Sequence, residues 1–201
     1  MDITSLIIFI AVNLVLAVLF GFIFGKTGIL EAESKKIAKW LKWVIGIIVF
    51  GAMSICGTLF GVSFDGPIMN ARDFAPVTAG VWFGPVIGIG AAIVGAVFRS
   101  IIGGASVVPC CISTILAGVL GSLVYLFLKK NSKKTGIIAP ALTAAVVGLI
   151  HMLLLCLLIP NGAGVAIAFG VVGIGTLASI VVCSFVFSLT YKLSSAKKAE
   201  N

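Results

Sequence analysis

The sequence predicts an all-α integral membrane protein, a bundle of five to six transmembrane helices with a broken or re-entrant third segment. Hydrophobic residues make up 61% of the 201 residues and charged residues only 10%, whereas a soluble domain has about a quarter of its residues charged. The apolar residues occur in long uninterrupted runs, and about 20 such residues form a helix that crosses a hydrocarbon core about 30 Å thick. Backbone amides inside lipid must be satisfied internally, so these runs predict helices. We expect residues 1–201 to form a single transmembrane domain.

Six apolar blocks follow one another along the chain. They cover about residues 5–24, 43–62, 74–98, 110–128, 137–159 and 165–191. The first lacks the positive leading region and the small-residue cleavage site of a signal peptide, so we expect it to remain as a helix. The third contains several glycines and prolines, among them Gly84-Pro85, and proline inside a helix removes a backbone hydrogen bond and clashes with the preceding turn. A break is therefore predicted in the third block, while the glycine-rich residues 162–175 obscure the start of the sixth.

Lysines cluster between and after the apolar blocks, in residues 25–42, in residues 129–134 and after residue 191. Such clusters mark the cytoplasmic side of a membrane protein, which predicts a multi-pass plasma-membrane protein with a cytoplasmic C-terminus. The first two clusters share a side only if one of the three blocks between them does not cross. We therefore expect five crossings plus a re-entrant third block; six crossings with one misplaced lysine cluster is the alternative. The apolar residues of the first connection indicate a short helix at the interface.

Several functional classes find no support. The net charge of +8 is explained by the lysine clusters, which suit topology and lipid headgroups, so no nucleic acid partner is expected. The five cysteines lack the spacing of a disulfide framework or a zinc site, so no metal and no cofactor are expected. No hydrolase triad, HExxH pattern or phosphate loop occurs, which argues against an enzyme. His151 is the only histidine, and a lone buried histidine is more often structural than a proton relay.

Two arginines, the only ones in the chain, bracket the third block at Arg72 and Arg99. The planar guanidinium matches a carboxylate or phosphate with two parallel hydrogen bonds. Ionisable groups near membrane depth are costly and usually functional, and two arginines close together repel unless an anion lies between them. The pair therefore predicts an anionic ligand. In the alternative, Arg72 pairs with Asp73 or Asp65 and Arg99 extends to the lipid headgroups.

Small and polar residues surround the arginines. Asn70 precedes Arg72 by two positions, and Gly103-Gly104 forms a tight turn whose amides can face an anion. Cys110 and Ser113 are three residues apart near the start of the fourth block, so they share a helix face beside the free amides of the first turn. Alternatively, Ser113 bonds back to its own helix and Cys110 only packs.

The stretch of residues 70–118 resembles the LytS-type five-transmembrane receptor domain, the membrane sensor of a family of bacterial histidine kinases. The matching landmarks are Asn70-x-Arg72, Gly80, Gly84-Pro85, Gly88, Gly95, Arg99, Gly103-Gly104, Ser113 and Gly118. The resemblance implies a bundle that couples an outside-facing ligand site to a cytoplasmic GAF-like module and kinase, in a family tied to murein hydrolysis and autolysis. The kinase part of the family has no counterpart in these residues, so no kinase activity is expected of the sensor region alone.

In family members that respond to pyruvate, the ligand positions are two arginines, a cysteine and a serine, which correspond to Arg72, Arg99, Cys110 and Ser113. The resemblance thus implies a receptor for a small extracellular carboxylate, and we also expect Asn70 to be a ligand-binding residue. Its expected partners are the lipid bilayer, a cytoplasmic kinase or signalling protein, and a second copy in a homodimer. The alternative is a small-solute transporter, or the substrate-binding subunit of one, for a carboxylate or vitamin, because broken helices line binding sites in both classes.

Overall fold

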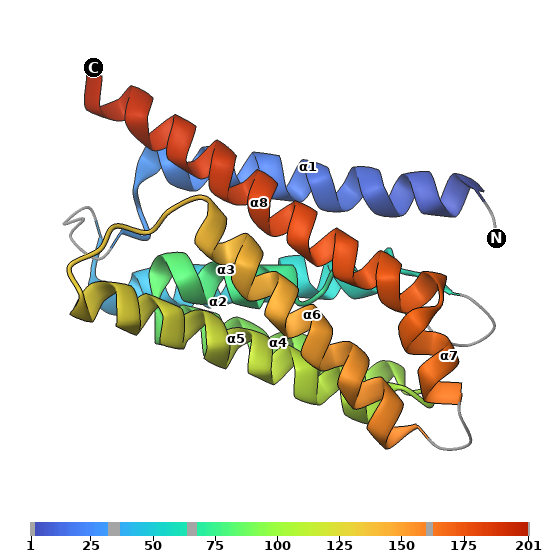
Figure 1. The fold of residues 1–201 in the computed structure, drawn as a ribbon. Coiled ribbons are helices and arrows are strands. Elements are labelled where there is room, and N and C mark those ends of the chain that lie inside the picture. Colours follow the sequence, from blue (N-terminus) through green and yellow to red (C-terminus); the bar gives the residue numbers. More distant parts are fainter. Residues whose placement is uncertain (1–2, 32–36, 64–67, 160–162, 201) are drawn as a thin grey trace.

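The computed structural model describes residues 3–31, 37–63, 68–159 and 163–200. Figure 1 shows these residues as a helical bundle with one short strand pair. The long helices are α1 (Ile3–Thr27), α2 (Lys39–Leu59), α4 (Pro85–Ile102), α5 (Val107–Lys130), α6 (Ile138–Leu158) and α8 (Val171–Glu200). The shorter elements are α3 (Phe74–Phe83), α7 (Ala163–Phe169) and the antiparallel strands β1 (Val62–Ser63) and β2 (Ile68–Met69), in which Val62 pairs with Met69.

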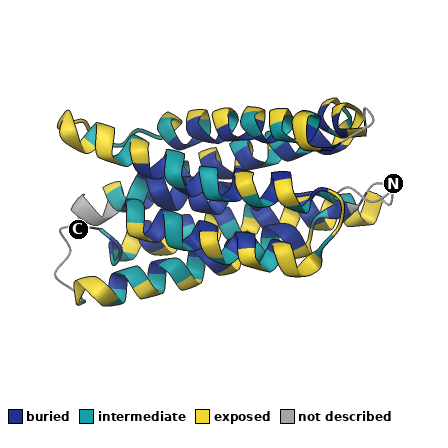
Figure 2. Cartoon of the chain, turned by 90° about the horizontal axis from the view of Figure 1, so that it is seen from below, coloured by how far each residue is buried: buried dark blue, intermediate teal, exposed yellow. Residues whose placement is uncertain are grey.

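Six helices in the described residues are long and apolar enough to cross a membrane, which confirms the predicted all-α membrane bundle of five to six spans. The burial pattern agrees, because the outward faces of the helices are exposed and the interior is buried (Figure 2). The exposed positions include many isoleucines, leucines and valines, whereas Arg72, Asp73 and Ser113 are completely buried. Water disfavours an apolar surface of this extent, while hydrocarbon accommodates it.

The third apolar block breaks at Gly84, as Gly84-Pro85 predicts. Gly84 has a φ of 92°, in the left-handed region that glycine enters at no steric cost. Pro85 then begins α4. The N–H that proline lacks would have no hydrogen-bond partner within the helix at this first position. Gly80 and Gly88 lie against each other across the break, because a Cβ on Gly88 would be only 2.5 Å from the Gly80 Cα atom. The block is therefore a helical hairpin that turns back towards its starting end.

This hairpin keeps the lysine clusters together. In Figure 1 the C-terminal ends of α1, α5 and α8 lie at one end of the bundle, and the N-terminal end of α1 lies at the other. The cytoplasmic location of the lysine end stays a prediction. The two halves of the expected re-entrant block differ in length. The first half, α3, is a short helix of 10 residues, whereas the second half, α4, has 18 residues and is long enough to cross the membrane alone.

Two further boundaries differ from the sequence interpretation. The interfacial helix expected in the first connection does not form in its described residues, 28–31 and 37–38, while Lys39 and Trp40 already belong to α2. The remaining residues of that connection lie outside the described chain. In the sixth block, α7 and α8 are separated at Gly170, so the glycine-rich stretch ends one helix and starts another. An apolar run alone does not reveal such a break.

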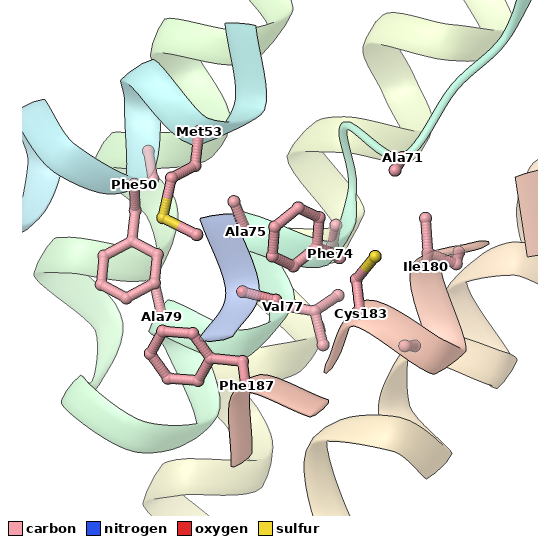
Figure 3. Packing of buried hydrophobic residues seen from close by; sticks show 14 of the residues in the cluster. Phe50, Met53, Ala71, Phe74, Ala75, Val77, Ala79, Ile180, Cys183 and Phe187 are labelled. Carbon is pink, nitrogen blue, oxygen red and sulfur yellow. The ribbon is translucent and has the colours of Figure 1, made fainter. Parts of the chain in front are cut away.

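The short helix α3 lies in the centre of the bundle. It packs against α2, α4, α5, α6 and α8, and its residues 74–81 are all buried. In Figure 3, Phe74 and Val77 of α3 lie between the side chains of α2 and those of α8. The surrounding side chains are Phe50 and Met53 of α2 and Ile180, Cys183 and Phe187 of α8. This packing fixes the N-terminal end of α3, and the charged residues directly before it, deep inside the protein.

Candidate ligand-binding site

The site begins with the turn of residues 70–73 that connects β2 to α3. The Asn70 side-chain oxygen accepts a hydrogen bond from the Arg72 backbone N–H at 3.3 Å, which closes the turn. The Asn70 backbone N–H donates to the Thr176 hydroxyl of α8 at 3.2 Å, and the Ala71 N–H donates to the Gly57 carbonyl of α2 at 3.3 Å. The turn is thus held between α2 and α8. Asn70, predicted as a ligand residue, shapes the turn that carries Arg72.

Arg72 is completely buried, and two of its three side-chain nitrogen atoms have hydrogen-bond partners within the protein. Its Nε donates to the Thr114 hydroxyl at 2.7 Å and lies 3.4 Å from an Asp73 carboxylate oxygen. One terminal nitrogen donates to the Cys110 carbonyl at 3.4 Å. The other, Nη1, has no hydrogen-bond partner among the described residues. The pairing of Arg72 with Asp73 is therefore present, while Asp65 lies outside the described chain.

Asp73 collects polar contacts from three helices. The Ser113 hydroxyl of α5 donates to its Oδ2 at 2.9 Å, and that oxygen is 3.5 Å from His151 Nδ1 of α6. The Thr114 hydroxyl lies 2.7 Å from Oδ1 and 2.9 Å from the Cys110 carbonyl, and its single proton serves one of the two acceptors. Ser113 is thus directed at Asp73 in this structure. Sequence reasoning considered Asp73 only as a partner of Arg72.

Arg99, in the last turn of α4, is only 2% exposed, so it does not extend to the headgroups as the alternative proposed. It donates to the Gly103 carbonyl and, at 3.1 Å, to the Ser106 hydroxyl. Gly103 and Gly104 have φ values of 77° and 99°, and the Gly103 carbonyl of this turn faces Arg99. Within the described residues, no carboxylate lies at ion-pair distance from Arg99.

Cys110 contacts both Arg72 and His151. Its carbonyl accepts from Arg72, and its thiol lies 3.5 Å from His151 Nε2. Cys110 and His151 line a cavity of about 10 Å³ together with Ser106 and Thr176, which leaves room for about one water molecule. Cys111 points elsewhere, because its thiol contacts the Ala96 carbonyl of α4.

The structure therefore brings the predicted residues Asn70, Arg72, Cys110 and Ser113 into one cluster, and Arg99 borders it through Ser106. Sequence reasoning did not place Thr114, Ser106, Thr176 or His151 at the site. Thr114 was detectable, because it is four residues after Cys110 on the same helix face. Ser106, Thr176 and His151 carry no local signal, since only helix packing places them here. As a whole, the cluster offers buried guanidinium donors and hydroxyls beside a small cavity that is lined by a thiol, an imidazole and two hydroxyls.

Comparisons with known proteins agree over most of the chain. A family model described as 5TMR of 5TMR-LYT matches residues 27–193, which include the whole cluster. The sensor histidine kinase BtsS of Escherichia coli strain K12 is 36% identical over 99 residues, 49% of this chain and 18% of that protein. The sensor protein LytS of Bacillus anthracis is 30% identical over 142 residues, covering 69% and 24%.

The sensor histidine kinase YpdA of Escherichia coli strain K12 is 28% identical over 155 residues, 75% of this chain and 26% of that protein. The chain thus spans only 18 to 26% of the length of these three relatives. No solved structure matches it.

Proposed function

We infer that this chain, which belongs to the 5TMR-LYT family of membrane sensor domains found in LytS- and BtsS-type histidine kinases, binds a small carboxylate such as pyruvate at the Arg72–Arg99 cluster. The family membership is the premise, and the ligand is our proposal. Binding would be the input, and transmission to a cytoplasmic histidine kinase or another signalling partner would be the output.

The excess of buried positive charge supports the anionic ligand most directly. In the described cluster, the two arginines face one carboxylate, Asp73, and that carboxylate lies at ion-pair distance from Arg72 but not from Arg99. A buried charge without a partner is costly, and Arg72 Nη1 also lacks an acceptor. A ligand carboxylate supplies both a negative charge and hydrogen-bond acceptors for these donors. Arg99 is therefore the residue on which we expect the affinity to depend most.

The other site residues have distinct proposed roles. Arg72 holds a second carboxylate oxygen through its free Nη1, and Asn70 maintains the turn that directs it. Cys110 and Ser113 lie on the same side of α5 and face the remaining part of the ligand. For Ser113 to bind the ligand, its hydroxyl has to donate to the ligand in place of Asp73. This set reproduces the ligand residues that the family resemblance implies.

The contacts of α3 with α8 support the signalling role. The site turn is bonded to α8 at Thr176. Further along, the Thr78 hydroxyl lies 3.3 Å from that of Ser184, and the Trp82 indole donates to the Ser188 hydroxyl at 3.0 Å. A displacement of the turn is therefore expected to move α8, whose C-terminal end lies at the lysine end of the bundle (Figure 1). The homodimer and the connection to autolysis stay predictions.

Binding measurements on variants of Arg99 test the proposal. We expect Arg99→Ala to weaken pyruvate binding about ten- to a hundredfold, because a charge-assisted hydrogen bond contributes about 1.5–3 kcal/mol. Arg99→Lys should restore only part of the affinity, since a point charge does not reproduce the guanidinium fork. Titration calorimetry of the purified chain measures both effects, with Lys192→Ala as a control that removes an exposed charge.

Unchanged affinity in Arg99→Ala would contradict the anion site. Counterflow of labelled pyruvate in proteoliposomes separates a receptor from a carrier, because only a carrier exchanges the substrate across the membrane.

A further inference from the structure

Cys110, His151 and Asp73 form a continuous chain of functional groups. The Cys110 thiol is 3.5 Å from His151 Nε2, and His151 Nδ1 is 3.5 Å from Asp73 Oδ2. The three residues come from α5, α6 and the turn before α3, and each is at least 96% buried. Enzymes activate a cysteine nucleophile with this connectivity: the imidazole takes the thiol proton and the carboxylate orients the imidazole.

The environment of His151 suits this role better than a purely structural one. A structural buried histidine satisfies both ring nitrogens with good partners. Here Nε2 faces a thiol, which is a weak partner, and Nδ1 is near Asp73 without making a hydrogen bond in the described chain. Cys111 is a natural contrast, because its thiol contacts only a backbone carbonyl of α4.

The thiol and the imidazole also border the same cavity, next to the arginines. Ser106, which accepts a hydrogen bond from Arg99, lines that cavity with Cys110 and His151. Neither arginine is among the described residues that line the cavity; Arg72 borders it through the Cys110 carbonyl and Arg99 through Ser106. A carboxylate that reaches both guanidinium groups is therefore expected to lie beside Cys110. A keto acid is larger than the cavity, so its entry requires the apolar wall, including Met152 and Ile167, to move outward.

We propose that Cys110 captures an α-keto acid reversibly through a covalent bond to its keto carbon. This inference rests on the proposed carboxylate site and narrows its ligand class from carboxylates to keto acids. The thiol proton passes to His151 Nε2, and the sulfur forms a bond to the keto carbon. The carbon–oxygen π electrons move to the oxygen, which receives the proton back from His151. The product is a thiohemiketal, no redox change occurs, and the reverse steps release the ligand.

Carbon-13 NMR of the purified chain with pyruvate labelled at the keto carbon tests the capture directly. A thiohemiketal carbon is tetrahedral, so the bound signal is expected to leave the ketone region and appear among singly bonded carbons. Cys110→Ser should lose this signal, while Cys111→Ala should keep it. Bound pyruvate with a ketone signal would overturn the covalent step and leave the carboxylate site intact. The absence of bound pyruvate would overturn both.

Alkylation provides a second readout that needs no ligand. Iodoacetamide should modify Cys110 about a hundredfold more slowly in His151→Gln, the lower range of general-base catalysis, as followed by mass spectrometry. The rate at Cys111 in the same samples is the internal control for folding and access. An equal rate at Cys110 in the wild type and in His151→Gln would show that His151 does not activate the thiol, and would refute the proposal.

Discussion

Removing the charge of Asp73 while keeping its shape is expected to destabilise the bundle strongly. In Asp73→Asn the side chain keeps one oxygen and replaces the other with an amide group that cannot accept a hydrogen bond. Arg72, which is completely buried and 3.4 Å away, then has no negative partner in the described cluster. Because the Ser113 hydroxyl donates to one carboxylate oxygen and Thr114 contacts the other, the hydroxyl that faces the new amide group can no longer donate to it.

The size of the effect follows from these contacts. Breaking a buried ion pair by removing one partner costs about 3–5 kcal/mol, and a lost hydroxyl hydrogen bond to a carboxylate adds about 1.5–3 kcal/mol. We therefore expect Asp73→Asn to lower the free energy of unfolding by at least about 3 kcal/mol. Removing both charges in the double variant Arg72→Gln, Asp73→Asn should cost less than the sum of the single changes, because no unpaired charge remains.

The free energy of unfolding of the four proteins in this double-mutant cycle is measured by titrating dodecyl maltoside micelles with SDS and following tryptophan fluorescence. A loss below about 1 kcal/mol in Asp73→Asn, the range of an exposed pair, would refute the reasoning. Additive losses in the double variant would equally refute it, since they would show that the two residues do not interact.

Two other predictions concern the packing of the site turn and the topology. A methyl group at Gly57 would lie 2.8 Å from the Arg72 backbone nitrogen of the turn, so Gly57→Ala should weaken pyruvate binding at least about tenfold, or about 1.4 kcal/mol. Gly136→Ala is the control, because no atom lies within 4 Å of its new methyl group. Unchanged pyruvate binding in Gly57→Ala would contradict the expected shift of the turn. In the variants Lys26→Cys and Lys133→Cys, a thiol reagent that does not cross the membrane should label the new cysteine from the cytoplasmic side. In Ala105→Cys, at an exposed position, it should label the cysteine from outside. Labelling of the Lys26 and Lys133 positions from opposite sides would favour the six-crossing alternative.

The sequence was sufficient for the features that depend on composition and local chemistry. Long apolar runs predicted the helices, and Gly84-Pro85 predicted the break between α3 and α4. The two arginines were recognisable as functional candidates because charge is rare in this chain. The pairing of Arg72 with Asp73 was one of the alternatives considered, because the two residues are neighbours in the sequence. The buried position of Arg99 was not recognisable, because it depends on the fold of the following turn.

The long-range contacts of the site could not be predicted from the sequence. Cys110 and His151 are 41 positions apart, and Asn70 and Thr176 are 106 apart. These pairs meet because α5 packs on α6 and the turn packs on α8, and several rotations of each helix would bury an equally apolar surface. His151 was therefore interpreted as structural, although the packing places it between a thiol and a carboxylate.

The short length of α3 has a consequence for how the protein is assembled. Ten residues of helix rise about 15 Å, half of a hydrocarbon core of about 30 Å, and the charged residues directly before α3 are completely buried inside the protein. A buried, non-helical charged turn persists only when surrounding protein satisfies it. Its partners on α5, α6 and α8 are all synthesised later than the turn itself. The candidate site is therefore complete only once α8 has been inserted, and a nascent chain that stops before α8 lacks one of the contacts that hold the turn.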